Sequence, residues 1–350
     1  MHSSPGVCVL ERLGPTNKDI FKWDGLRCDP ERVEYVRVVV RNRFDSLLKG
    51  ESSADPINVF IKTEPHKLSK VEEGRFRLIS AVSLVDTLVD RVLAGWLMRT
   101  VLNTACSNPC MIGWSPVSGG WKLLEALLPG KVLCVDKQAW DWTVQEWLID
   151  SWLNVIESLA VGAADWWIRI LRLRFRLLFR DAIFQFPDGS QAQQKCWGVM
   201  KSGCYWTILL NSLSQTLLHY VTQYQIGKPL HDNEPYTMGD DTIQTYFEYI
   251  GEYLSEMAKY GPIIKEAKVT RHKEFAGFVW TQGWCCPAYY NKHLFRLCYG
   301  DLKDFLEMYQ ILYANDATML TLLQRVAMEL DVTLHRTTRE CKVIMNGLPR

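Results

Sequence analysis

A short segment near residue 240, Tyr-Thr-Met-Gly-Asp-Asp-Thr-Ile-Gln, constrains this chain more than any other. Gly239 and Asp240 stand between two short runs that favour strands. A glycine followed by an aspartate is typical of a tight hairpin turn, because glycine adopts positive φ angles. Asp240 and Asp241 should therefore lie together at the tip of a hairpin, where their charges repel each other unless a divalent cation or a raised pKa relieves them. Many Gly-Asp-Asp triplets are ordinary surface turns, so a metal site requires partners elsewhere in the chain.

The composition is that of a globular chain with balanced charge. Apolar residues make up 48% of the 350 positions, enough for a large core in one domain or in two to three subdomains. The formal net charge of +1 excludes a uniformly basic nucleic-acid-binding protein, so a phosphate-binding surface must come from local clustering. The sequence predicts no secretory signal at its start and no transmembrane helix.

The cysteines favour reduced thiols over a disulfide framework, because there are eleven of them and their spacing is irregular. Two groups contain residue types that can ligate zinc: Cys106 with Cys110, and Cys285, Cys286, His293 and Cys298. Neither group has the Cys-x-x-Cys spacing typical of structural zinc sites, so free thiols are the preferred interpretation.

An apolar run at residues 131–136 supplies the first candidate partner for the hairpin. The run is nearly continuous, as in a strand buried on both faces, and it ends in Asp136. Asp141 follows shortly afterwards, before a helix predicted over residues 142–159. Asp136 and Asp240 can face one another across a sheet, and two such carboxylates can hold two divalent ions about 3.5–4 Å apart.

A basic region lies further upstream. A strand that begins at Ile57 is expected to lead into a basic loop that ends near Lys70, and a second strand is predicted over residues 75–79. The cations of this region are Lys62, Lys67, Lys70, Arg75 and Arg77. A solvated sheet edge, where charges prevent aggregation, explains them as well as a cradle for a polyphosphate or an RNA backbone does.

Hydrophobic periodicity predicts most of the helices. They are expected over residues 31–48, 83–102, 164–179 and 247–260, with two more between 302 and 330, the second capped by Asp316. The helix over 164–179 carries Arg169, Arg172, Arg176 and Arg180 on one face. A solvated basic face is preferred there over contact with nucleic acid or an acidic membrane surface. A hairpin is predicted over 182–191, a glycine-rich loop over 111–120 and a strand over 274–280.

A further polar pattern begins at Ser202 and Gly203, which look like a flexible start of a helix. Thr207 and Asn211 lie four residues apart in that helix and share one face. On a face otherwise lined by leucine, this pair predicts either a buried polar site or a satisfied core network.

In order along the chain, these segments resemble the RNA-dependent RNA polymerases of positive-strand RNA viruses. The similarity runs from about residue 57 to 285. The matching motifs are Lys62-x-Glu64 through Arg75-x-Arg77-x-Ile79, Asp136-x-x-x-x-Asp141, Ser202-Gly203-x-x-x-Thr207-x-x-x-Asn211, Gly239-Asp240-Asp241, the segment 261–268 and Phe275-Ala276-Gly277. Residues 62–93 and Gly113-Trp114-Ser115-Pro116 look most like the sobemo-like and polerovirus-like group.

The resemblance implies an α+β fold shaped like a closed right hand, with an antiparallel palm sheet backed by helices. Fingers and fingertips would occupy residues 1–130, the palm 131–147 and 198–285, a fingers insertion 148–197, and the thumb 286–350. The palm would transfer a nucleotide from an NTP to an RNA 3′-hydroxyl on a template, replicating and transcribing a viral RNA genome.

The resemblance also assigns roles to residues. Asp136, Asp240 and Asp241 would hold Mg²⁺, with Mn²⁺ as an alternative, and Asp240 is expected to share a metal with Asp136. Lys268, or instead Lys265, would protonate the leaving pyrophosphate. Lys62, Arg75 and Arg77 would bind the triphosphate. Ser202, Gly203, Thr207, Asn211 and Asp141 would check the template and the ribose 2′-hydroxyl.

The implied partners are template and nascent RNA, NTPs, other viral replication proteins and, as one mode of initiation, a protein primer. The implied location is the host cytoplasm at membrane-associated replication complexes. Two alternatives stay open. One is a DNA-making palm polymerase of the reverse transcriptase type, against which Asp141 and Asn211 argue. The other is an RNA-binding palm relic without turnover, against which the complete set of aspartates argues.

Overall fold

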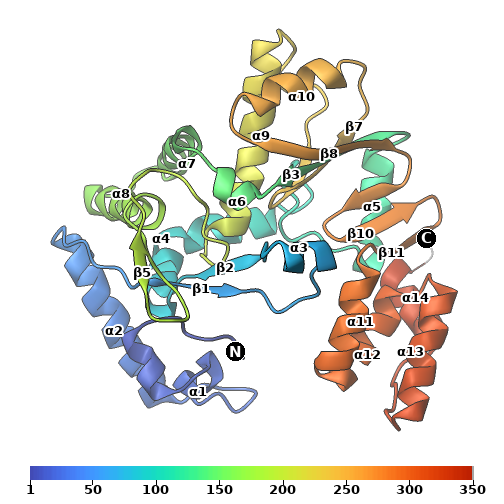
Figure 1. Cartoon of the computed structure of the whole chain (residues 1–350), viewed down its shortest axis with the longest axis horizontal. Helices are drawn as coiled ribbons and strands as arrows, with labels where there is room; N and C mark the ends of the chain where they lie inside the picture. Colours follow the sequence, from blue (N-terminus) through green and yellow to red (C-terminus); the bar gives the residue numbers. More distant parts are fainter. Residues whose placement is uncertain (349–350) are drawn as a thin grey trace.

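A four-stranded antiparallel sheet, here called the central sheet, is formed by the middle part of the chain in the computed structural model, which describes residues 1–348. Its strands stand in the order β6 (Tyr236–Met238), β7 (Asp241–Thr245), β3 (Val132–Gln138) and β8 (Ile263–Thr270). Leu133 and Val135 of β3 point into the main hydrophobic core. On one face of the sheet this core is completed by α7 (Glu146–Leu159), α9 (Thr207–Gln225) and α10 (Ile250–Ala258). Figure 1 shows β3, β7 and β8 of this sheet next to α9 and α10. The expected antiparallel sheet backed by helices is therefore present.

A second sheet joins segments that are far apart in sequence. Its order is β2 (Leu78–Ala81), β1 (Ile57–Ile61), β4 (Ile183–Gln185) and β5 (Gln191–Gln193), and β1 pairs with β4 in parallel. The predicted hairpin over 182–191 is confirmed as β4 and β5. The predicted strand over 75–79 begins later, at Leu78, and a short helix, α3 (Leu68–Glu72), occupies the expected basic loop.

A third sheet follows the central one. It contains β9 (Lys273–Phe275), β10 (Phe278–Thr281) and β11 (Trp284–Pro287), paired antiparallel. The single strand predicted over 274–280 is wrong, because Ala276 and Gly277 form a turn with φ angles of 48° and 80°. Two successive positive φ angles reverse the chain, as in a type I′ hairpin turn.

The helices agree with the predicted periodicity where they are long. The elements of the first half are η1 (Val9–Leu13), α1 (Asn17–Phe21), α2 (Pro30–Leu48), α4 (Leu84–Asn103), η2 (Val117–Gly119), α5 (Gly120–Leu127), α6 (Trp140–Thr143), α7 (Glu146–Leu159) and α8 (Asp165–Phe179). Those of the second half are α9 (Thr207–Gln225), α10 (Ile250–Ala258), α11 (Tyr290–Tyr299), α12 (Leu302–Leu312), α13 (Ala317–Glu329) and α14 (Thr338–Asn346).

Differences from the predictions concentrate at short helices and helix ends. The helix predicted over 142–159 is divided into α6 and α7, and α5 was not predicted. The helix predicted over 247–260 begins three residues later, at Ile250. Asp316 caps α13 as expected, since its side chain accepts a hydrogen bond from the amide of Met319 at 3.0 Å.

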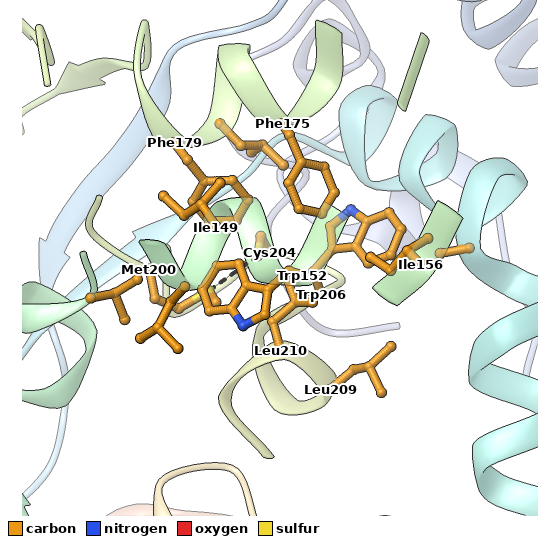
Figure 2. Packing of buried hydrophobic residues seen from close by; sticks show 14 of the residues in the cluster. Ile149, Trp152, Ile156, Phe175, Phe179, Met200, Cys204, Trp206, Leu209 and Leu210 are labelled. Atoms are coloured by element: carbon orange, nitrogen blue, oxygen red, sulfur yellow. Dashed lines mark hydrogen bonds between the residues drawn. The ribbon is translucent and has the colours of Figure 1, made fainter. Parts of the chain in front are cut away.

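Aromatic side chains fill the core between α7, α8 and the start of α9. Figure 2 shows Trp152, Phe175, Phe179 and Trp206 packed together. The ring centres of Trp152 and Phe179 are 5.5 Å apart, and those of Phe175 and Trp206 are 5.4 Å apart, both in edge-to-face geometry. Such pairs stabilise a core beyond the area that they bury.

A buried ion network joins α2, α4 and α8. Arg174 of α8 is fully buried and donates two parallel hydrogen bonds to Asp90 of α4, at 2.9 and 3.1 Å. Arg43 of α2 forms ion pairs with Asp86 and Asp55 beside them. Burial alone would lower the pKa of Arg174, but Asp90 and Asp86 outweigh it and raise the pKa, so the guanidinium stays charged.

The arginine face of α8 lies at the surface, as preferred from the sequence. Arg172 forms a two-point ion pair with Glu157 at 2.6 and 2.7 Å. Arg176 and Arg180 both pair with Asp181, at 2.6 and 2.9 Å. Each of these three arginines is therefore paired with a neighbouring acid. Arg174 lies off this face, and it is the arginine of α8 whose buried charge joins the helix to α4.

All eleven cysteines are free thiols. Between residues 1 and 348, no three histidine, cysteine or acidic side chains are close enough to form a ready-made metal cluster, and this includes both cysteine groups weighed for zinc. Nor does that part of the chain contain a helix long and apolar enough to cross a membrane.

The buried pair gives a stability prediction. Asp90→Ala should lower the free energy of unfolding by about 3–5 kcal/mol, because it leaves the charge of Arg174 buried without its two-point partner. Arg172→Ala is the matched control on the same helix: its side chain is 62% exposed, and its loss should cost less than about 1 kcal/mol. Urea denaturation measures both variants. Equal losses would contradict the structural role of the buried pair.

Candidate active site

Asp136 stands near the end of β3, at the floor of an open cleft of about 850 Å³. The pairing of β3 with β8 changes register immediately after it: Asp136 lies opposite Glu266, whereas Lys137 lies opposite Ile264. Lys265 is therefore the extra residue of a β-bulge, and its ammonium forms an ion pair with the Asp136 carboxylate. Bulges re-aim side chains, and this one directs a lysine at the candidate metal ligand.

The aspartate hairpin has the predicted form. Met238 pairs with Asp241, so Gly239 and Asp240 are the two residues of the turn, and Gly239 has a φ of 67°. The amide of Gly239 donates a hydrogen bond of 2.8 Å to the hydroxyl of Ser212 in α9. Because Val135 pairs with Thr242, the next positions along the two strands bring Asp136 beside Asp241.

The aspartates of this site repel one another, and the pKa of Asp241 reflects both desolvation and this repulsion. The side chain of Asp241 is solvent-accessible, but surrounding protein removes much of its water, and Asp240 and Asp136 add negative charge. Together they raise the pKa of Asp241 to about 6. Solvent-accessible carboxylate oxygens in mutual repulsion are suited to a hard divalent cation, so the residues present fit such an ion.

Lys137 lies beneath the aspartates and was not predicted. Its side chain is 6% exposed. Burial lowers its pKa to about 8, although Asp240, Asp241 and Asp136 oppose the shift. The alternation of β3 explains its place, because Val135 and Lys137 point to the helix-covered face of the sheet while Asp136 points to the other.

Asp141 and Asn211 meet, as the sequence predicted for residues of one site. The Asn211 amide donates a hydrogen bond of 3.0 Å to the Asp141 carboxylate, and its carbonyl accepts one of 2.9 Å from the indole of Trp140. Burial raises the pKa of Asp141, while Asn211 opposes the shift. Asn211 is buried, so the pair is held in a fixed orientation at the wall of the cleft.

The predicted basic residues line the same cleft as Asp136 and Asp240. Lys62, Arg75 and Arg77 all line it. Arg77 forms an ion pair with Glu64 at 2.8 Å, and Lys62 does so at 3.3 Å. Partial burial alone would raise the pKa of Glu64, but Arg77, Lys62 and Lys292 outweigh it and lower the pKa. Lys292 belongs to α11 and approaches Glu64 to 4.0 Å, so this acid also links the C-terminal helices to the basic region.

The segment before α9 is held in place, which corrects the prediction of a flexible helix start. The hydroxyl of Ser202 accepts a hydrogen bond of 3.0 Å from the amide of Ser80 in β2, and the amide of Gly203 donates one of 3.1 Å to the carbonyl of Ser80. Glycine is required here by close approach, because a Cβ on Gly203 would lie 2.9 Å from that carbonyl oxygen. The Thr207 hydroxyl donates to the carbonyl of Lys201 at 2.7 Å.

The two candidate lysines of β8 lie in different places. Lys265 lines the large cleft, whereas Lys268 lines a smaller neighbouring cavity of about 130 Å³ and pairs with Glu266 at 3.2 Å. Asp136 borders both cavities, and Asp241 borders the smaller one. The cleft thus brings together the predicted residues from all segments except Lys268, Gly203 and Asp241, which lie at its margins.

Two residues of the candidate site, Lys137 and Ser212, belong to no motif that would have identified them from the sequence. Lys137 looks like one more surface lysine, and its burial becomes visible only when β3 is placed between two strands. Ser212 looks like an ordinary helical serine, yet it holds the aspartate turn. Its position next to Asn211 is the one feature that could have indicated it.

Comparison with known proteins agrees with this site. A sequence model of the family described as viral RNA-dependent RNA polymerase matches residues 1–275. This chain therefore belongs to the viral RNA-dependent RNA polymerase family.

The relatives refine that placement. The chain is 33% identical over 267 residues to the replicase polyprotein P2AB of Southern bean mosaic virus. The aligned region covers 70% of the chain and 26% of the polyprotein. It is 29% identical over 274 residues to protein P1-P2 of potato leafroll virus (72% and 24% covered). It is 31% identical over 212 residues to the RNA-directed RNA polymerase of mushroom bacilliform virus (58% and 50% covered). The chain spans about a quarter of the length of the two polyproteins. The resemblance to sobemovirus and polerovirus replicases is thus confirmed.

The close approach at Gly203 gives a test. Gly203→Ala should lower the free energy of unfolding by about 1–3 kcal/mol, because the new methyl group overpacks against Ser80 and Ala81 of β2. Gly251→Ala is the control: it lies in α10 with open space around it, and should be neutral or stabilising by up to about 1 kcal/mol. Thermal unfolding compares the two. An unchanged melting temperature for Gly203→Ala would show that the segment is not clamped to β2.

Proposed function

We propose that this chain is an RNA-dependent RNA polymerase that transfers nucleotides from NTPs to an RNA 3′-hydroxyl on an RNA template and so replicates and transcribes a viral genome. The observation that carries the proposal is the single cleft that is lined by Asp136 and Asp240 and also by Lys62, Arg75 and Arg77. A reaction between a hydroxyl and a triphosphate requires acidic and basic side chains in one cleft, since both metal ions and phosphates must be held.

The fold fits a closed right hand. In this proposal the central sheet with α9 and α10 is the palm (131–147 and 198–285), and residues 1–130 with the insertion 148–197 are the fingers. The C-terminal helices (286–350) are the thumb. The contact between Lys292 and Glu64 supports closure, because it joins the proposed thumb to the proposed fingertips.

Asp136, Asp240 and Asp241 would hold the divalent ions, Mg²⁺ or alternatively Mn²⁺. When bound, such ions lower the pKa of the attacking 3′-hydroxyl and neutralise the developing charge on the phosphates. The protein contributes orientation: Ser212 fixes the turn that carries Asp240, and the β3 pairing fixes Asp136. Asp240 shares the cleft with Asp136, whereas Asp241 borders the smaller cavity, which supports an auxiliary role for Asp241.

The sugar would be checked on the palm side of the cleft. Asn211 presents an amide that is already fixed by Asp141 and Trp140, so the pair can distinguish a ribose 2′-hydroxyl without reorganising. Ser202 and Thr207 line the same wall, and Gly203 holds that wall against β2. Lys62, Arg75 and Arg77 would take the triphosphate by charge-assisted hydrogen bonds.

The partners follow from the reaction and from the relatives. We infer that the chain acts on template and nascent RNA and on NTPs, with other viral replication proteins and, in one mode of initiation, a protein primer. Its place of action would be the host cytoplasm at membrane-associated replication complexes. Synthesis of DNA by a related palm is the competing function, and Asn211 with Asp141 argues against it, because an enzyme that excludes ribose needs a bulky residue at this wall.

Substitution of the turn aspartate tests the catalytic assignment. Asp240→Ala should abolish incorporation of rNTPs on an RNA template in the presence of Mg²⁺ while leaving RNA affinity nearly unchanged. The control is Asp150→Ala, which removes an exposed aspartate from α7, away from the cleft. Residual synthesis in Asp240→Ala would refute the assignment, and preferred use of dNTPs by the unmodified protein would favour the DNA-making alternative.

Position in the cleft supports Lys265 over Lys268 as the general acid, and the two lysines form a matched pair for a test. Lys265→Met should reduce the rate of incorporation by about 10²- to 10⁴-fold at saturating NTP, as expected when a general acid is lost. Lys268→Met should reduce it by less than about threefold, since an exposed pair with Glu266 contributes little. Single-nucleotide incorporation measures both, and the reverse order of effects would assign the role to Lys268.

A further inference from the structure

Lys201 is a cation inside the protein without an acidic partner. Its side chain has no exposed surface, and it is among the largest fully buried side chains. Within residues 1–348 it forms no ion pair with any carboxylate. Buried lysines without a counter-ion are rare, because the charge loses its hydration without a compensating attraction.

Uncharged groups replace that counter-ion. The ammonium donates hydrogen bonds to the side-chain carbonyl of Gln194 at 2.6 Å and to the backbone carbonyl of Val199 at 2.9 Å. It also lies 5.6 Å from the ring centre of Phe179 and 5.4 Å from that of Phe184, within the range of cation–π attraction. Lys201 therefore contacts the end of α8, strand β4 and its own loop at once.

Gln194 links Lys201 to further backbone groups by hydrogen bonds of its own. Its side-chain amide donates hydrogen bonds to three backbone carbonyls, those of Phe179 at 2.8 Å, Cys196 at 2.8 Å and Gly198 at 3.0 Å. One buried lysine and one buried glutamine thus fix residues 194–201 to the fingers insertion.

The next residues are those of the sugar-checking wall. The backbone carbonyl of Lys201 accepts the Thr207 hydroxyl at 2.7 Å and the amide of Cys204 at 3.0 Å. Directly after Lys201, Ser202 and Gly203 bind Ser80 of β2. Directly before it, the amide of Met200 donates to the carbonyl of Asp141 at 2.7 Å. Lys201 stands where the insertion, β2 and the Asp141 segment converge.

Stability does not explain a lysine at this point. Burial lowers its pKa to about 7, although Cys204 and Cys196 oppose the shift. A methionine would fill the same space between two phenylalanine rings without a charge to bury, and the desolvation cost that it saves offsets the loss of the hydrogen bonds to the two carbonyl groups. What methionine cannot do is hold Gln194 and Val199 by directional hydrogen bonds.

We propose that Lys201 is a positioning residue: by anchoring residues 194–201 to the fingers insertion, it sets the position of the wall formed by Ser202, Thr207 and Asn211, and thereby the selection of ribonucleotides. The proposal rests on the proposed polymerase function. Lys201 itself lines neither cavity that borders the aspartates, so it acts through its neighbours.

Lys201→Met tests the proposal. The melting temperature should stay the same or rise, whereas kcat/KM for rNTPs should fall by about 10- to 100-fold, because small displacements of a positioning wall have effects of that size. The ratio of rNTP to dNTP incorporation should fall as well, and a residue needed only for stability would not change this ratio. Lys195→Met is the matched control, since it removes an exposed lysine from the same loop and should leave the ratio unchanged.

Amide hydrogen exchange gives a readout independent of activity. In nucleotide-free protein, the amides of Gly203 and Cys204 should exchange faster in Lys201→Met than in the unmodified chain. If no nucleotide is incorporated by either protein but exchange accelerates, the polymerase proposal fails and the anchoring of the loop stands.

The proposal is overturned if Lys201→Met leaves the exchange and the rNTP preference unchanged, or if it lowers the melting temperature while the preference is kept. Should Lys201→Met not fold, Lys201→Leu, which also removes the hydrogen-bond donor, undergoes the same measurements with the same criteria.

Discussion

Repulsion between three aspartates is the constraint on which the rest of the site depends. Asp136, Asp240 and Asp241 gather where β3 ends and β7 begins, and without help their charges would weaken the pairing of these two strands. The protein opposes this in two ways. Lys265 approaches Asp136 from a bulge in β8, and Lys137 lies beneath the group with its charge facing all three. A divalent cation would complete the neutralisation rather than begin it.

Hydrogen bonds from α9 give the same site its geometry. Ser212 accepts the amide of Gly239, while its neighbour Asn211 holds Asp141 and Trp140. Two adjacent residues of one helix therefore position both carboxylate-bearing segments. Asn211 and Ser212 can lie in the largely apolar core because each has a partner, and a buried polar group with a partner costs little while its orientation is fixed.

Charge is buried in two different ways around α8. Arg174 lies between Asp90 and Asp86, and this network joins three helices that are distant in sequence. Lys201 lies between two aromatic rings and two carbonyl groups, without an acid. The first arrangement holds the helices together, and loss of one aspartate would leave the charge of Arg174 buried without its partner. The second is suited to orienting a loop, since it depends on directional donors more than on net attraction.

The sequence by itself determined the elements whose information is local. The hairpin at Gly239 and Asp240, the strand that ends near Asp136 and the long helices α2, α4 and α8 follow from turn chemistry and periodicity, which depend on neighbouring residues. The order of the segments was enough to indicate the polymerase family. The buried polar setting of Asn211 could be anticipated, because a polar residue on a leucine-lined face requires partners, whereas its hydrogen bond to Asp141 became visible only in the structure.

Tertiary structure alone decided which charges are buried and which face the cleft. Arg174 has the same local setting as Arg172, yet one is enclosed by α4 and the other is exposed. Lys265 and Lys268 stand three residues apart, and the bulge opposite Asp136 sends them to different cavities. The turn at Ala276 and the short helices α3 and α5 also escaped prediction, because short elements carry little periodicity of their own. Burial and register arise from contacts between segments far apart in the chain, so no local pattern contains them.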